Sequence, residues 1–146
     1  MIGIVLKGHD FKYEVSELVK LFTSELRFID ERDCMMVVEN TLFSHNNNIF
    51  SKTVYCENYG VIYEHVEHRS LEGLSKREEK KVIKETIKRS MFKILEKKFK
   101  ITPPWGILTG IRPVKIVHSL LDDNFSDEEI REKLTRDYFI SDDKID

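Results

Sequence analysis

The sequence predicts an α+β fold: a largely antiparallel sheet of about four strands with amphipathic helices on one face, followed by a short helical C-terminal piece. Two observations lead to this class. The middle of the chain is a run of strand-forming residues interrupted by two turn signals. Apolar residues recur at helical spacing on either side of that run. Strands gathered in the middle, with helices before and after them, are typical of α+β proteins.

The strands are predicted from β-branched runs and the turns that end them. Ile2 to Lys7 is a short run of this kind, and Gly8 ends it. Three further strands are expected over residues 35–43, 49–57 and 61–69, as an antiparallel meander. Gly60 is expected to supply the positive φ of the second tight turn. The sequence leaves open whether the first strand pairs beside the meander or inside it.

Four helices are predicted from apolar spacing and capping signals. The first should follow an N-cap at Asp10, bury a stripe that includes Val15 and Leu18, and end near Ser24. The second is predicted from a capping box at 75–78 to Phe99. A shorter helix should begin at Pro113 and cover 113–121, and another should begin at a second capping box and cover 126–137. These elements divide the chain into an α+β domain over 1–100 and a turn-and-helix piece over 101–146.

Composition narrows the class of protein without naming a function. The chain has 146 residues, 40% of them hydrophobic, with a formal net charge of -2. The hydrophobic fraction excludes disordered and collagen-like chains. The net charge gives no overall basic field for nucleic acid or membrane binding. No stretch has the apolar length of a membrane span or the pattern of a signal peptide. With two cysteines, Cys34 and Cys56, a reducing, cytoplasmic location is expected.

Several residue pairs resemble chemical sites, but each has a simpler structural explanation. His65 and His68 lie three apart on an expected strand, so they should point to opposite faces and cannot share a metal. The two cysteines lack redox spacing and are expected to be buried. His9 and Asp10 could form a base with its carboxylate, but capping explains Asp10 more simply. No phosphate-binding loop, nucleophile elbow or paired-histidine protease motif occurs.

A segment near the C-terminus carries the chain's most distinctive residues. Residues 103–118 hold three prolines, the single tryptophan Trp105, and Gly110 just before an expected helix. Arg112 and Lys115 lie in the first turn of that helix, where free amides and the helix dipole favour an anion. Trp105, Gly110, Arg112 and Lys115 are therefore the candidate binding residues. A carboxylate or phosphate site and a structural interdomain turn explain this segment equally well.

The run Trp-Gly-Ile-Leu-Thr-Gly-Ile-Arg-Pro at 105–113 resembles the N-terminal part of the HemZ-type oxygen-independent coproporphyrinogen III dehydrogenases and oxidases. The opening residues 4–18 and the stretch 138–144 are similar to that family as well, whereas the central sheet region matches only in general character. The resemblance implies a radical S-adenosylmethionine enzyme of haem biosynthesis, which decarboxylates substrate propionates to vinyl groups.

In this family a four-iron four-sulfur cluster and S-adenosylmethionine bind in a barrel domain, through a Cys-x-x-x-Cys-x-x-Cys motif that this chain lacks. The chain is therefore expected to be an N-terminal fragment, complete at Met1 and cut short at Asp146, with no catalytic residue and no cofactor of its own. Its expected partners are the catalytic barrel of the same protein and the porphyrinogen substrate, which Arg112 and Lys115 could meet at a propionate.

The rival hypothesis is a stand-alone module that binds RNA or a protein through the Lys-rich helix over 76–100. Glutamates alternate with these cations, which is more typical of a solvated helix face, so nucleic acid is not the expected partner.

Overall fold

The computed structural model describes residues 1–33, 35–104, 106–107 and 124–140, and it divides the chain into two compact units, Met1–Ile101 and Thr102–Asp146. The first unit contains the sheet and two helices. Its elements, in chain order, are β1 (Ile2–Lys7), α1 (Lys12–Val19), β2 (Leu26–Phe28), β3 (Met36–His45), β4 (Asn48–Glu57), β5 (Gly60–Ser70) and α2 (Lys76–Phe99). The second unit contains α4 (Asp127–Tyr138). These elements confirm the predicted α+β class.

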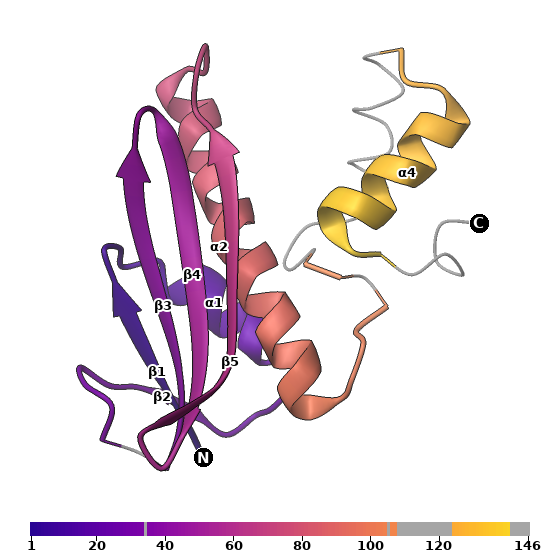
Figure 1. Cartoon of the computed structure of the whole chain (residues 1–146). Helices are drawn as coiled ribbons and strands as arrows, with labels where there is room; N and C mark the ends of the chain where they lie inside the picture. Colours follow the sequence, from indigo (N-terminus) through magenta and orange to yellow (C-terminus); the bar gives the residue numbers. More distant parts are fainter. Residues whose placement is uncertain (34, 105, 108–123, 141–146) are drawn as a thin grey trace. The chain divides into compact units, whose positions relative to one another are not determined.

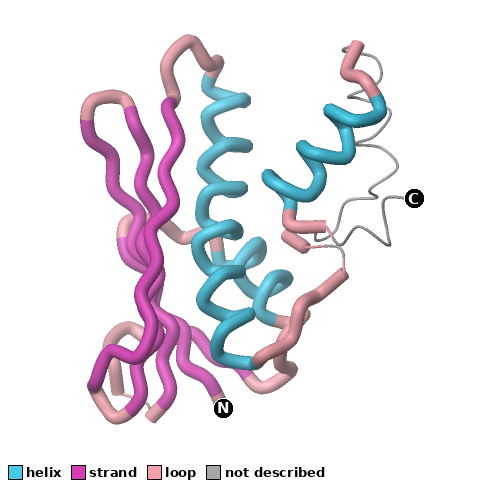
Figure 2. Tube along the Cα trace, turned by 45° about the vertical axis from the view of Figure 1, so that its right-hand side comes forward, coloured by secondary structure: helices cyan, strands magenta, loops and turns pink. Residues whose placement is uncertain are grey.

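The sheet of the first unit has five strands in the order β2-β1-β3-β4-β5, and both helices lie on the same face of it (Figures 1 and 2). The meander β3-β4-β5 is antiparallel, as predicted, and β1 lies beside it. β1 runs parallel to β3 and to β2, because α1 carries the chain back across the sheet between β1 and β2. β2 was not predicted, since a strand of three residues gives no alternating pattern to recognise.

Both tight turns of the meander use non-glycine residues with positive φ. Asn46 and Asn47 have φ of 49° and 61°, and Asn58 and Tyr59 have φ of 50° and 68°. The expectation that Gly60 supplies the positive φ is therefore wrong, because Gly60 is already the first residue of β5. Two successive left-handed residues match the right-handed twist of a hairpin, and asparagine tolerates this conformation better than most residues.

The prediction for the first helix is wrong at both ends. Phe11, not Asp10, occupies the N-cap position without a side-chain hydrogen bond, and the helix ends at Val19 rather than near Ser24. At the N-terminal end, the His9 side chain takes the place of a cap, because its Nδ1 accepts the Phe11 amide at 3.2 Å. The buried stripe is as expected and includes Val15, Leu18 and Val19.

α2 begins and ends where the sequence predicts. The Ser75 hydroxyl accepts from the Glu78 amide, and the Glu78 carboxylate accepts from the Ser75 amide. The helix ends at Phe99, and its C-cap residue Lys100 has a left-handed conformation. α2 lies against β4 and β5 and against α1. Its buried face includes Ile87, Met91, Ile94 and Leu95, which pack on the sheet to form the core of the first unit.

In the second unit, the predicted capping box between Ser126 and Glu129 opens α4. Ile130, Leu134 and Tyr138 are the buried residues of this helix. The helix predicted over 113–121 lies outside the described residues. No helix of the described residues has both the length and the apolar character that crossing a membrane requires.

Candidate functional site

The four residues predicted to bind an anion or to dock a domain, Trp105, Gly110, Arg112 and Lys115, lie outside the described residues. The two described residues inside the same motif have a clear structural role. The Ile107 amide donates to the Tyr138 carbonyl at 2.8 Å, and Ile107 is buried. Gly106 has a φ of 59° and lies so close to the Tyr138 and Phe139 backbone that no side chain fits there. Gly106 and Ile107 are therefore attached to the C-terminal end of α4.

The first unit contains a cluster of polar side chains enclosed between the sheet and α2. We call this cluster the core polar network, and its members are His9, Asn40, Ser51, Thr53 and Ser90. All except His9 have no exposed surface. Polar groups this deep are tolerated only when hydrogen bonds replace those they made with water.

Asn40 is the centre of the core polar network. Its Oδ1 accepts from His9 Nε2 at 2.7 Å, and its Nδ2 donates to Ser51 Oγ at 2.8 Å and to Thr53 Oγ1 at 2.9 Å. Thr53 Oγ1 in turn lies 2.8 Å from Ser90 Oγ on α2. The network therefore joins the loop after β1, two strands and the long helix through side chains alone.

The hydrogen bonds of His9 fix its tautomer. Because Nδ1 accepts the Phe11 amide, the ring proton must be on Nε2, where it is donated to Asn40. Burial lowers the pKa of His9, which keeps the ring neutral. With both nitrogens engaged, His9 has no lone pair with which to act as a base, and it makes no pair with Asp10. The core polar network thus holds the loop after β1, β3, β4 and α2 together.

On the opposite face of β3, Glu39 is held by two cations. Arg32 contacts it through Nε at 2.8 Å and through Nη2 at 3.2 Å, and Lys7 Nζ lies 3.5 Å away. The Glu39 side chain is only 9% exposed. The hydrogen bond from Arg32 holds the pKa of Glu39 below its usual value of 4.5. This cluster ties the segment after β2 to the sheet.

Replacing Glu39 with glutamine should therefore reduce stability in a pH-dependent way. A carboxylate whose pKa is depressed on folding stabilises the protein above its unfolded pKa, and this contribution is lost as pH falls through the folded pKa. We expect Glu39→Gln to lower the free energy of unfolding by about 1 kcal/mol at pH 7, because Arg32 is partly exposed to solvent. Urea titrations should show this difference shrinking at pH values below 4.5. The control is the exposed Glu72→Gln, and a difference that does not vary with pH would contradict the assignment.

The residues considered as metal or redox ligands do not come together. His65 bonds Glu67 at 2.6 Å on the face that α2 covers, whereas the His68 ring lies 5.6 Å from that of Phe50 on the other face. This confirms that the two histidines point apart. Cys56 is buried, which raises the pKa of its thiol, and Cys34 lies outside the described residues. Among the described residues, no group of three His, Cys, Asp or Glu side chains is placed to hold a metal ion.

Several cations of the Lys-rich helix α2 are used within the first unit. Lys84 pairs with Glu14 of α1 at 3.2 Å, and Lys98 pairs with Glu57 at 3.3 Å. Arg89 bonds Glu67 at 3.0 Å. Burial by itself would raise the pKa of Glu67, but the hydrogen bond from His65 and the charge of Arg89 outweigh it and lower that pKa. These cations attach α2 to its neighbours, which leaves a smaller basic surface than the sequence suggests.

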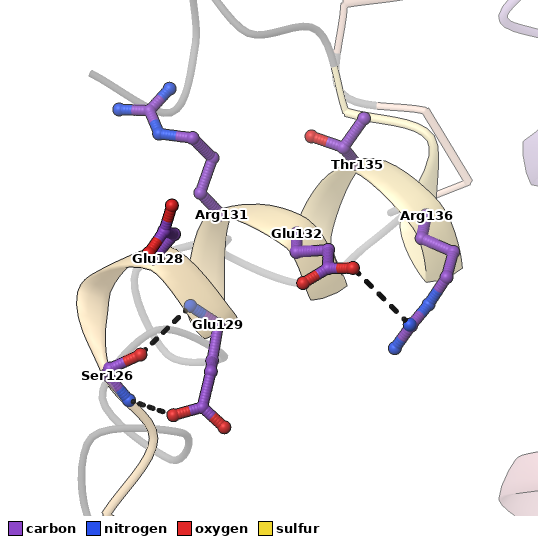
Figure 3. Close-up of a pocket in the computed structure, with 7 residues that line it drawn as sticks. All are labelled: Ser126, Glu128, Glu129, Arg131, Glu132, Thr135 and Arg136. Atoms are coloured by element: carbon purple, nitrogen blue, oxygen red, sulfur yellow. Dashed lines mark hydrogen bonds and ion pairs between the residues drawn. The ribbon is translucent and has the colours of Figure 1, made fainter.

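A hollow lies on the surface of α4, and Figure 3 shows the described residues that line it. These residues are Ser126, Glu128, Glu129, Arg131, Glu132, Thr135 and Arg136. Ser126 and Glu129 cap each other, and Arg136 lies 3.9 Å from Glu132. The described part of the lining therefore carries charges of both signs.

The fold of the described residues is that of an α+β protein with a mixed five-stranded sheet. No family model and no solved structure matches the chain. The chain is 40% identical over 72 residues to the oxygen-independent coproporphyrinogen-III oxidase-like protein HemZ of Bacillus subtilis (strain 168). The matched stretch is 49% of this chain and 14% of that relative. This similarity confirms the resemblance to HemZ-type proteins.

Proposed function

We propose that this chain is the N-terminal accessory region of an oxygen-independent coproporphyrinogen III oxidase or dehydrogenase, and that it is itself non-catalytic. The observation that carries the proposal is the 40% identity to the HemZ relative over 72 residues. The geometry of the first unit supports an accessory role, because its buried polar groups serve to fix β3, β4 and α2 in place. The reaction proposed for the whole protein is the radical-based decarboxylation of propionates to vinyl groups.

The cofactors of that reaction do not fit the residues of this chain. A four-iron four-sulfur cluster needs several cysteine thiolates, and the chain has two cysteines separated by 21 residues, of which Cys56 is buried with a raised pKa. The proposal therefore assigns the cluster and S-adenosylmethionine to a barrel domain elsewhere in the protein. No step of the reaction is assigned to a residue of this chain.

Within the proposal, Arg112 and Lys115 are the residues through which the accessory region meets that barrel or a substrate propionate. Both are cations in the segment that follows the two prolines, and a substrate rich in carboxylates requires fixed cations. Trp105 and Gly110 would shape the same segment.

The first test is the reading frame of the native gene beyond the codon for Asp146. The proposal expects an open frame that encodes a Cys-x-x-x-Cys-x-x-Cys motif, and a stop codon there would contradict it. The second test uses the protein from that frame, purified without oxygen. It should contain about four irons per chain, whereas the chain of 146 residues alone should contain none.

The role of the two cations is tested in the same full-length protein. Arg112→Gln combined with Lys115→Gln should weaken binding of coproporphyrinogen or loosen the contact between domains, seen as a raised KM or a lowered Tm. The matched control removes two exposed cations of α2, Lys76→Gln with Lys80→Gln, and should change neither quantity. Unaltered KM and Tm in the Arg112/Lys115 variant would contradict this part of the proposal.

A further inference from the structure

The strand β5 forms one edge of the sheet (Figure 1). It pairs with β4 over its whole length of 11 residues, and no strand of the described residues lies on its other side. Natural edge strands are usually protected by charged side chains, above all lysine, by proline or by a bulge. β5 carries Glu64, Glu67 and Arg69 but neither proline nor lysine, and the one register shift lies near its start, opposite Tyr55 and Cys56. Most of this edge is therefore a regular row of backbone donors and acceptors.

The side chains of β5 include an unusual amount of exposed apolar surface. Val61, Ile62 and Val66 are 54%, 50% and 43% exposed. Tyr59, in the turn that leads into the strand, is 72% exposed. Exposed apolar residues along an edge without proline or lysine are typical of a strand that pairs with another chain.

The polar side chains of β5 favour a second copy of the same strand as the partner. In an antiparallel pair centred on Val66, Glu64 of each copy lies opposite His68 of the other, and His65 lies opposite Glu67, so that each carboxylate faces an imidazole with which it can form a hydrogen bond. Val66 then lies opposite itself. Centring the pair on Glu64 or on Glu67 would place two carboxylates opposite each other, which is destabilising. A pair centred on His65 places no glutamate opposite a histidine.

The aromatic row on the open face of the sheet is a weaker candidate for an interface. Phe43 and Phe50 stack with their centroids 5.2 Å apart and 6° between their planes, and His68 lies beside Phe50. Since Phe43 and His68 flank Phe50, the middle ring has little free face on which a nucleic acid base could stack. The row is explained by packing between neighbouring strands.

We propose that β5 pairs antiparallel with β5 of a second copy of this chain, about a two-fold axis at Val66, so that two five-stranded sheets become one continuous sheet. Residues 62–70 of each copy overlap in this register, a length of about 30 Å at the rise of an antiparallel strand. The interface is isologous, because both copies contribute the same residues. The pairing satisfies the edge backbone groups and covers Ile62 and Val66.

Sedimentation of the 146-residue chain over a concentration series tests the proposal. The wild-type chain should form a dimer, and Val66→Lys should weaken it about tenfold or more, because two like charges then meet on the axis. The control is Tyr13→Lys on α1, which adds the same charge at a residue 69% exposed and should leave the dimer unchanged. A wild-type chain that stays monomeric, or a Val66→Lys variant that dimerises like wild type, would overturn the proposal.

A disulfide test reports the register and does not depend on the lysine variant folding. In a Cys34→Ser background, Val66→Cys should cross-link two copies under mild oxidation, because residue 66 lies opposite itself. Glu64→Cys, which lies opposite His68, should not cross-link. Equal cross-linking of both variants, or of neither, would refute the pairing about Val66. Circular dichroism of each variant verifies that the fold is retained.

Discussion

Replacing Asn40 with leucine is expected to lower the free energy of unfolding by about 3 kcal/mol, because buried polar partners lose their hydrogen bonds and cannot reach water. Asn40 accepts from His9 and donates to Ser51 and Thr53. Leucine has nearly the same shape, so the loss reports the missing hydrogen bonds rather than a cavity. Urea or thermal unfolding of the 146-residue chain measures it.

The control for this prediction also removes the hydroxyls of Ser51 and Thr53, two of the three partners that lose their hydrogen bonds to Asn40. Combining Asn40→Leu with Ser51→Ala and Thr53→Val should restore part of the lost stability, since polar groups that are replaced together by apolar groups leave fewer buried partners unpaired. This non-additive recovery would identify unsatisfied polar groups as the cause. A triple variant whose loss equals the sum of the three single losses would instead show that the hydroxyls stabilise the core independently of Asn40.

The features that could be predicted from the sequence are those determined by neighbouring residues. Both capping boxes lie within four consecutive residues, and α2 begins and ends at the predicted points because its cap and its stop are local signals. The meander could be predicted for the same reason, since its turns follow the strands directly. At the second turn the prediction that Gly60 takes the positive φ was wrong, because a shift of one residue in the turn gives this conformation to Asn58 and Tyr59 instead.

The features that could not be predicted depend on residues far apart in the chain. β1 pairs in parallel with β2 and β3, and the core polar network joins His9 to Asn40 across 31 residues. A signal for this network was present, since Ser51 and Thr53 are two apart on one strand and so share a face. That signal becomes meaningful only when α2 is known to cover the same face. The role proposed for Trp105, Gly110, Arg112 and Lys115 requires a barrel domain or a substrate as partner, so it stays a prediction.

Replacing Gly8 with alanine is expected to destabilise the first unit by about 3 kcal/mol, through backbone strain and overlap together. Gly8 has a φ of 82°, and a methyl group there would overlap the Leu42 carbonyl of β3. Gly73 separates the two causes, because its φ is 75° and an added methyl group meets nothing within 4 Å.

Gly73→Ala should therefore cost only about 1 kcal/mol, which is the strain of a left-handed alanine. The excess loss in Gly8→Ala, measured by urea unfolding, reports the close approach of the loop to β3. Because His9 follows Gly8 directly, a shift of the loop that relieves the overlap is expected to move His9 Nε2 away from Asn40. The pKa of His9, measured by NMR, should therefore change in Gly8→Ala but not in Gly73→Ala. Equal losses in the two variants, with an unmoved His9 titration, would show that the loop yields freely and that the core polar network does not depend on Gly8.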